Sequence, residues 1–187
     1  MERVVRASSF SAKECVKIGI FTALIAVGAF IRVPVPLCPF TLQFLFTTLA
    51  GLVLGKRCGA MAVLVYVALG LMGVPVFTSG GGPSYIFEPT FGYLIGFIVG
   101  AWIVGAWREH YGASSFRRLL VGAMIDLLVV YAFGMAYVYI INTFYLGTPI
   151  GLWPLVVYCF ILAVPGDICL CIVGALFYRR VAQHISV

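Results

Sequence analysis

Six long stretches of apolar residues constrain this chain more than any other feature of its sequence. They cover approximately residues 15–33, 41–56, 59–73, 91–107, 119–144 and 153–178. A helix needs about 17–25 apolar residues to cross a bilayer, so each stretch is a candidate span, although several are short. Only 10% of the residues are charged, against about 25% in soluble domains. The sequence therefore predicts an all-α integral membrane protein, a bundle of six transmembrane helices forming one membrane domain over residues 1–187. It excludes a water-soluble enzyme, a nucleic-acid-binding protein and a disordered chain.

The basic residues predict how this bundle is oriented. Eleven of the twelve Lys and Arg residues precede or open the first stretch, end or follow the second, or follow the fourth and sixth, and only Arg32 falls on the opposite side. Because basic residues concentrate on the cytoplasmic side of membrane proteins, we expect both termini in the cytoplasm. The outer connections Val33–Phe40, Gly73–Thr90 and Tyr145–Leu152 are rich in Pro and Gly and almost uncharged. Such a composition is typical of a folded lid rather than a solvated loop.

Two aspartates interrupt apolar stretches. Asp167 follows Pro165, which suits the first turn of a helix, and lies 12 residues before Arg179, about 18 Å along a helix. A carboxylate at that depth is costly unless it has a partner or a wet cavity, so Asp167 is the first candidate for ligand binding; the alternative is that it caps its own helix. Asp126 lies nearer the cytoplasmic side, and we expect it to make an interhelical hydrogen bond.

Other candidate site residues lie on the same outer side. The glycines of the long connection allow tight turns or close approach of the backbone to a ligand, and its aromatic rings can wall an apolar ligand or form an interfacial belt. Gln43 offers both a donor and an acceptor, for a ligand or for a helix cap. The candidates besides Asp167 are Gln43, Phe77, Gly81, Gly82, Tyr85, Phe91 and Tyr93.

The remaining motifs are weaker. No nucleophile–base pair and no acidic metal cluster stands out in the sequence, so neither an enzyme nor a metal site is expected. The six cysteines lie mostly in apolar runs, where buried reduced cysteine is the usual outcome. The first stretch carries Gly19, Ala23 and Ala26 on one face. Such small residues allow close helix packing inside the bundle or against another membrane subunit.

Taken together, these segments resemble the BioY family, the biotin-specific substrate-binding (S) components of energy-coupling-factor (ECF) transporters. The resemblance runs from about residue 15 to 180 and rests on the order and spacing of several motifs. These are Ala26-Val-Gly-Ala-Phe-Ile, Pro34-Val-Pro, Thr41-Leu-Gln, Leu49-Ala-Gly-Leu-Val-Leu-Gly, Gly70-Leu-Met-Gly-Val-Pro-Val-Phe, Gly80-Gly-Gly, Pro89-Thr-Phe-Gly-Tyr-Leu and Pro165-Gly-Asp.

The resemblance implies a high-affinity biotin receptor in the cell membrane of a prokaryote, with the vitamin held in an outward-facing pocket under the first and second outer connections. It implies no cofactor and no ATPase activity in this chain. Its partners would be a transmembrane coupling subunit and two ATP-hydrolysing subunits, docked on the small residues Gly19, Ala23 and Ala26. Asp167 would accept hydrogen bonds from the ureido N–H groups of biotin, backbone N–H groups near Gly81 and Gly82, or Gln43, would bind its oxygens, and aromatic rings would cover its apolar part.

Two positions depart from the family pattern. Leu170 stands where the family commonly has a lysine that assists at the binding site, and Phe91 stands where a second glycine is more usual. Three other functions also stay open. They are an S component for another vitamin such as thiamin, a stand-alone facilitator, and a membrane scaffold without a ligand.

Overall fold

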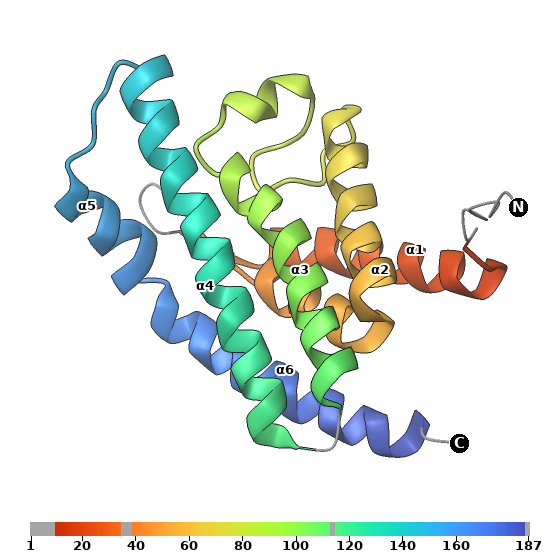
Figure 1. The fold of residues 1–187 in the computed structure, drawn as a ribbon. Helices are drawn as coiled ribbons and strands as arrows, with labels where there is room; N and C mark the ends of the chain where they lie inside the picture. The colour runs from red at the N-terminus through yellow and green to blue at the C-terminus, as the bar shows by residue number, and fades with distance from the viewer. Residues whose placement is uncertain (1–9, 35–38, 113–114, 186–187) are drawn as a thin grey trace, which may run out of the picture.

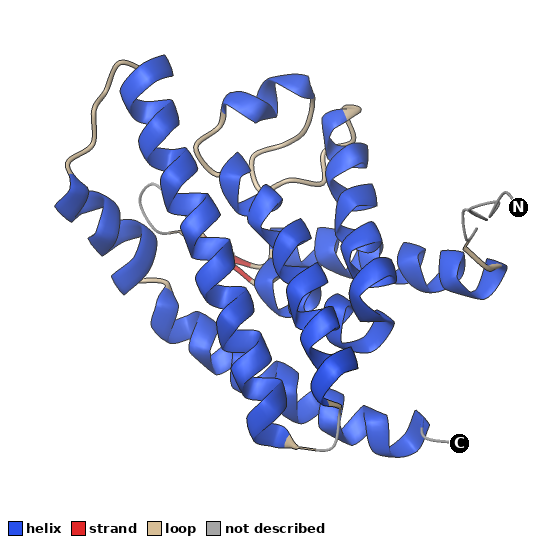
Figure 2. Cartoon of the chain, in the orientation of Figure 1, coloured by secondary structure: helices blue, strands red, loops and turns tan. Residues whose placement is uncertain are grey.

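The chain is mostly helical, with one small hairpin. The structure, a computed structural model, describes residues 10–34, 39–112 and 115–185. Its helical elements are α1 (Ala12–Phe30), α2 (Gln43–Leu71), η1 (Pro83–Phe87), α3 (Phe91–Tyr111), α4 (Phe116–Ile140), η2 (Ile141–Tyr145), α5 (Leu152–Val156), η3 (Val157–Ile161) and α6 (Val164–Ile185). The strands β1 (Arg32–Val33) and β2 (Phe40–Thr41) pair antiparallel between α1 and α2 (Figure 2).

The helices form a bundle in which neighbours in sequence are mostly neighbours in space. Helices α2, α3 and α4 pack side by side, α1 packs on α2, and α6 crosses against α2 and α4 (Figure 1). Small residues allow these close contacts. At Gly96 of α3, for example, an added Cβ atom would lie 2.9 Å from the Cα atom of Val130 in α4.

Four helical stretches are long and apolar enough to cross a membrane, judged by length and composition. They are Gln43–Leu71, Phe91–Tyr111, Phe116–Tyr145 and Leu152–Ala182. The predicted spans 41–56 and 59–73 fall within the single helix α2, which is interrupted at Gly55, where φ is 83° and ψ is 175°. The first predicted span corresponds to α1, which is not among the four. The count of six spans therefore stays a prediction.

The last helical region is divided before Asp167. The sequence predicts one span over 153–178 with a break near Pro165. In the structure, α5 continues directly into η3, which ends at Ile161, and α6 begins at Val164. Pro165 lies in the first turn of α6, where its missing N–H group leaves no intrahelical bond unmade. Asp167 is in the same turn, and this arrangement directs its side chain toward α4.

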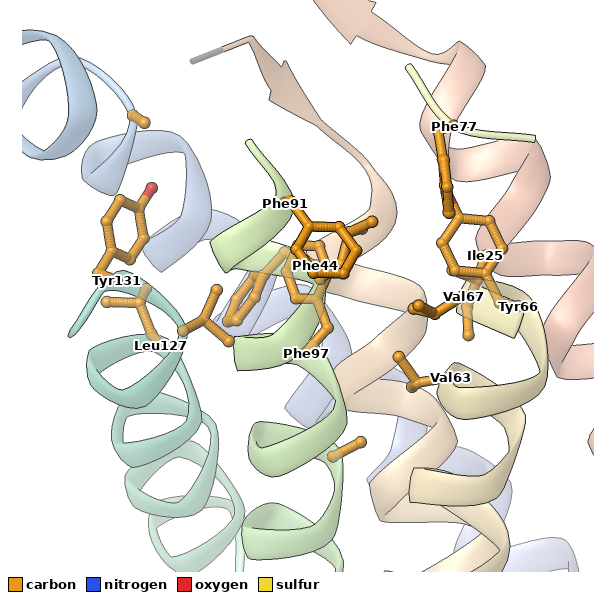
Figure 3. Close-up of a cluster of buried hydrophobic side chains, with 14 of the residues drawn as sticks. Ile25, Phe44, Val63, Tyr66, Val67, Phe77, Phe91, Phe97, Leu127 and Tyr131 are labelled. Carbon is orange, nitrogen blue, oxygen red and sulfur yellow. The ribbon is translucent and has the colours of Figure 1, made fainter. Parts of the chain in front are cut away.

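The main hydrophobic cluster joins the helices to the connection between α2 and α3. Phe44, Phe91 and Phe97 belong to this cluster and are labelled near the centre of Figure 3. Phe77 and Tyr85, from the segment 72–90, are 2% and 4% exposed and belong to the same cluster. This segment also contains η1 and is tied to α2 by the bond from the Gly82 N–H group to the Gly70 carbonyl, 2.7 Å long. The expectation that this connection is folded is therefore confirmed.

Candidate ligand-binding cavity

A cavity of about 60 Å³ lies where the hairpin, the segment 72–90 and helices α3, α4 and α6 meet. Most of its lining is aromatic or aliphatic, and a few polar groups converge on it. The lining residues are Pro39, Phe40, Thr41, Gln43, Phe44, Thr78, Tyr85, Thr90, Tyr93, Leu94, Phe97, Val130, Tyr131, Cys159, Ala163 and Asp167. An apolar cavity with few convergent polar groups is the usual form of a small-molecule site.

Asp167 supplies the carboxylate of this cavity and is 6% exposed. Its Oδ2 atom accepts a hydrogen bond from the Tyr131 hydroxyl at 2.5 Å, whereas its buried Oδ1 atom has no protein partner among the described residues. Leaving a buried acceptor unpaired costs about 1–3 kcal/mol, so Oδ1 is suited to a donor on a bound molecule. The alternative of helix self-capping does not hold, because no described backbone N–H group donates to this carboxylate.

Asp126 is equally buried but does not line the cavity. The Thr48 hydroxyl of α2 donates to its Oδ2 atom at 2.7 Å, so the expected interhelical hydrogen bond is confirmed. Its Oδ1 atom faces Gly100 of α3 so closely that a Cβ atom there would overlap it. Asp126 therefore joins α2, α3 and α4 and has no access to a ligand in the cavity.

Gln43, the first residue of α2, has both ends of its amide engaged. Its Nε2 atom donates to the Tyr66 hydroxyl at 2.7 Å, and its Oε1 atom accepts from the Thr41 hydroxyl at 3.3 Å. Tyr66 in turn donates to the carbonyl of Val76 at 3.0 Å. This chain of bonds joins the hairpin, both halves of α2 and the segment 72–90 beside the cavity, so Gln43 is a cavity-lining residue whose orientation is fixed.

The aromatic candidates divide into two layers. Tyr85 and Tyr93 line the cavity, and each is held by its hydroxyl: Tyr85 contacts Thr78 and Thr90 at 3.2 Å each, and Tyr93 donates to the carbonyl of Cys159 at 3.3 Å. Phe77 does not line the cavity but packs behind Tyr85, with ring centroids 4.4 Å apart.

The remaining predicted residues lie outside the cavity lining. Phe91 is buried against Tyr137, with ring centroids 5.8 Å apart. Gly81 and Gly82 lie in the covering segment, and the Gly82 N–H group already donates to Gly70, so in this conformation it is not available to a ligand. Gly81 packs against the Val74 carbonyl, which leaves no room for a side chain.

Tyr131 is a cavity-lining residue that the sequence analysis does not single out. It is 4% exposed, it lines the cavity, and it holds the Asp167 carboxylate. Figure 3 shows its ring extending from α4 toward the C-terminal segment. A hydroxyl in the middle of an apolar helix needs a hydrogen-bond partner, and this was the available signal in the sequence. That the partner is Asp167 depends on how α4 and α6 pack.

Metal-ligating side chains do not cluster in the described part of the chain. Cys58, Cys159 and Cys171 are buried thiols, whereas Cys15 and Cys169 are exposed. Cys38, the sixth cysteine, lies outside the described residues. The cavity offers one carboxylate, several hydroxyls and apolar walls, a combination typical of small-molecule sites.

Comparison with known proteins agrees with this description. Residues 3–187 match the BioY family. The probable biotin transporter BioY of Lysinibacillus sphaericus is 41% identical over 165 residues, 88% of this chain and 84% of that protein. The biotin transporter BioY of Thermotoga maritima is 46% identical over 124 residues, 66% of this chain and 72% of that protein.

Among solved structures, the fold matches the crystal structure of the S-component for biotin from an ECF-type ABC transporter. The TM-score is 0.79 at 23% sequence identity, over 94% of this chain and 95% of that one. At this identity the structural likeness shows a shared fold only. Membership of a family is shown by the match of residues 3–187 to the family model. Because that match extends over almost the whole chain, this protein belongs to the BioY family.

Proposed function

We propose that this chain binds biotin and takes part in biotin uptake as the S component of an ECF-type ABC transporter. The relatives named as biotin transporters and the S-component fold support this proposal. On this proposal the chain is a transport subunit rather than an enzyme, it uses no cofactor, and ATP hydrolysis belongs to its partners.

The observation that carries the proposal is the unpaired Oδ1 atom of Asp167 in the cavity. Biotin has a ureido ring with two N–H donors, an apolar thioether ring and a carboxylate on a flexible chain. The Asp167 carboxylate accepts from the ureido N–H groups, and a hydrogen bond to a charged acceptor contributes about 1.5–3 kcal/mol. Tyr131 fixes the orientation of the carboxylate, and the rings of Tyr85, Tyr93 and Phe97 cover the apolar part.

The lysine that commonly assists at the family's binding site has no counterpart among the described residues that line this cavity. Leu170, at the position where the family commonly has lysine, packs against the main hydrophobic cluster and does not line the cavity. Two neutral groups of the lining can donate to the ureido oxygen: the second N–H of the Gln43 amide, whose first donates to Tyr66, and the Thr78 hydroxyl. We propose that binding at the ring relies on them together with Asp167.

The orientation of the bundle is also part of the proposal. Counting the two halves of α2 around Gly55 as separate helices, we propose six membrane helices with both termini in the cytoplasm. The hairpin and the segment 72–90 would then cover the pocket from outside the cell, in the cell membrane of a prokaryote. The positions of the basic residues and the covering segments support this orientation.

The proposed docking face for the coupling subunit lies on α1. Gly19 and Ala23 are exposed, Ala26 is partly buried, and a Cβ atom added at Gly19 would meet nothing within 4 Å. Small exposed residues allow another membrane helix to approach closely. This face would bind the ECF transmembrane subunit, which carries the two ATPase subunits.

Direct titration of the purified protein with biotin tests the proposed function. We expect saturable one-site binding, measured by calorimetry in detergent, with thiamin as the control ligand. Binding of thiamin in place of biotin would identify an S component for another vitamin. Absence of binding by either compound, in protein that elutes as a single folded species, would contradict a vitamin-binding role.

A further inference from the structure

Arg32 lies at the edge of the cavity, between the two segments that cover it. In the hairpin, Arg32 of β1 is the register partner of Thr41 in β2. Its side chain reaches the other covering segment, where Nη1 donates to the Thr78 carbonyl at 2.5 Å. Because Thr41 and Thr78 both line the cavity, the guanidinium group is held at the cavity rim.

The charge of this guanidinium group is not used by the protein itself. No carboxylate among the described residues forms an ion pair with Arg32, and its side chain is exposed. A guanidinium group carries five N–H donors, of which the Thr78 carbonyl takes one. The other donors can therefore bind an anionic group without breaking the bond that holds the side chain in place.

The two charged groups of the site lie at different depths. Among the described residues, the lining of the cavity includes the carboxylate of Asp167 and no Lys, Arg or His. Asp167 extends from α6 beneath the covering segments, whereas Arg32 lies in the hairpin that forms part of the cover. A ligand with neutral N–H donors at one end and an acid at the other matches this pattern in one orientation only, with its N–H donors at Asp167 and its acid at Arg32.

We infer that Arg32 binds the carboxylate of the ligand at the cavity mouth, while Asp167 binds its ureido ring below. The inference rests on the proposed function and extends it to the acid end of biotin. A guanidinium–carboxylate contact is charge-assisted and directional. Since Arg32 also holds Thr78, a bound carboxylate joins the hairpin to the segment 72–90 and favours the closed cover.

The test compares biotin with biotin amide, which has the same skeleton without the negative charge. We expect wild-type protein to bind the amide at least about tenfold more weakly than biotin. In Arg32→Gln, biotin binding should weaken by about tenfold or more, and binding of the amide should change by less than about twofold. Arg32→Lys keeps the charge and should keep part of the preference for biotin.

Several results would overturn the inference. If Arg32→Gln weakened biotin and biotin amide equally, Arg32 would serve only to hold Thr78, although biotin binding itself would stand. Equal affinity of the wild-type protein for biotin and biotin amide would show that no cation binds the carboxylate of biotin. This result needs no variant protein. If wild-type protein bound neither compound, the proposed function would fail together with this inference.

Discussion

Asp126 and Asp167 are both buried in apolar helices, but their surroundings differ. Asp126 is bonded to Thr48 and closely packed against Gly100, whereas Asp167 is bonded to Tyr131 and keeps one oxygen atom toward the cavity. A carboxylate inside a membrane protein is costly unless partners satisfy it. Each carboxylate has one bonded oxygen and one buried oxygen without a partner among the described residues. Only Asp167 lines the cavity, so on the proposed function a donor on the ligand completes its bonding.

Replacing Asp167 with Asn is the most direct test at the residue scale. The substitution removes the charge and turns an acceptor into a group that also donates, which conflicts with the ureido N–H donors. We expect biotin binding to weaken at least about tenfold, about 1.4 kcal/mol, measured by calorimetry. Asp126→Asn is the matched control, because its amide oxygen still accepts from Thr48. Unchanged affinity in Asp167→Asn would contradict the role of Asp167.

The site residues show how far sequence reasoning reached. Asp167 stands out because a charge in an apolar run needs a partner, and Gln43, Tyr85 and Tyr93 follow from their position beside the outer connections. The sequence does not distinguish rings that line the cavity from rings that support it, and it predicts Phe77 and Phe91 as site residues in the same way as Tyr85. That distinction depends on which way each side chain points in the folded bundle, which no local pattern specifies.

At the scale of the elements, α2 shows how a break is built inside a helix. The sequence predicts that the break falls at Lys56 and Arg57, because charged residues usually flank a span. In the structure it falls at Gly55, whose φ of 83° suits glycine. The Lys56 N–H group donates to Glu109 at 3.0 Å, and the Lys56 ammonium group pairs with the same carboxylate at 3.2 Å. A contact with α3 therefore fixes the position of the break.

Gly55→Ala should destabilise the fold. A side chain at this φ costs about 1–2 kcal/mol, and the added Cβ atom would lie 2.7 Å from the Oε1 atom of Glu109. We expect a lower midpoint of thermal unfolding in detergent. The midpoint is measured with a thiol-reactive dye that becomes fluorescent when unfolding exposes the buried cysteines. Gly19→Ala is the control, because that position is helical and open, and alanine there should leave stability unchanged or raise it slightly. A midpoint for Gly55→Ala that equals that of the wild type would contradict this account of α2.

The exposed face of α1 leads to a prediction about transport. A bulky residue at Ala23 would hold a partner helix away from this face without reaching the cavity, which α1 does not line. We expect Ala23→Trp to bind biotin normally and to lose uptake in cells that contain the coupling subunits. Leu128→Trp, at an exposed position of α4, is the control and should transport normally. Normal uptake by Ala23→Trp would exclude α1 as the docking face.

At the scale of the whole molecule, the structure explains binding and leaves energy coupling to other subunits. The cavity lies under a cover that is hydrogen-bonded to the helices, and a closed site holds its ligand without releasing it on the other side. The mostly helical fold could be predicted from the apolar stretches alone. The mutual packing of α2, α3, α4 and α6 could not, because it depends on contacts between residues far apart in the chain.

Reconstitution into liposomes tests this division of work. We expect the chain alone to bind biotin on the vesicle surface and to accumulate none inside, whereas vesicles that also contain the coupling subunits and ATP should accumulate it. The measurement is retention of radiolabelled biotin after dilution, with Asp167→Asn as the control for specific uptake. Accumulation by the chain alone would instead identify a stand-alone facilitator.

The cavity wall is assembled from segments that begin at Pro39 and end at Asp167. Neither half of the polypeptide holds a complete set of these side chains. We therefore expect that a fragment made by cutting between α3 and α4 does not bind the ligand by itself. On the proposed function, recognition of the vitamin depends on the complete tertiary structure, and a shift of any helix that lines the wall would change the shape of the cavity.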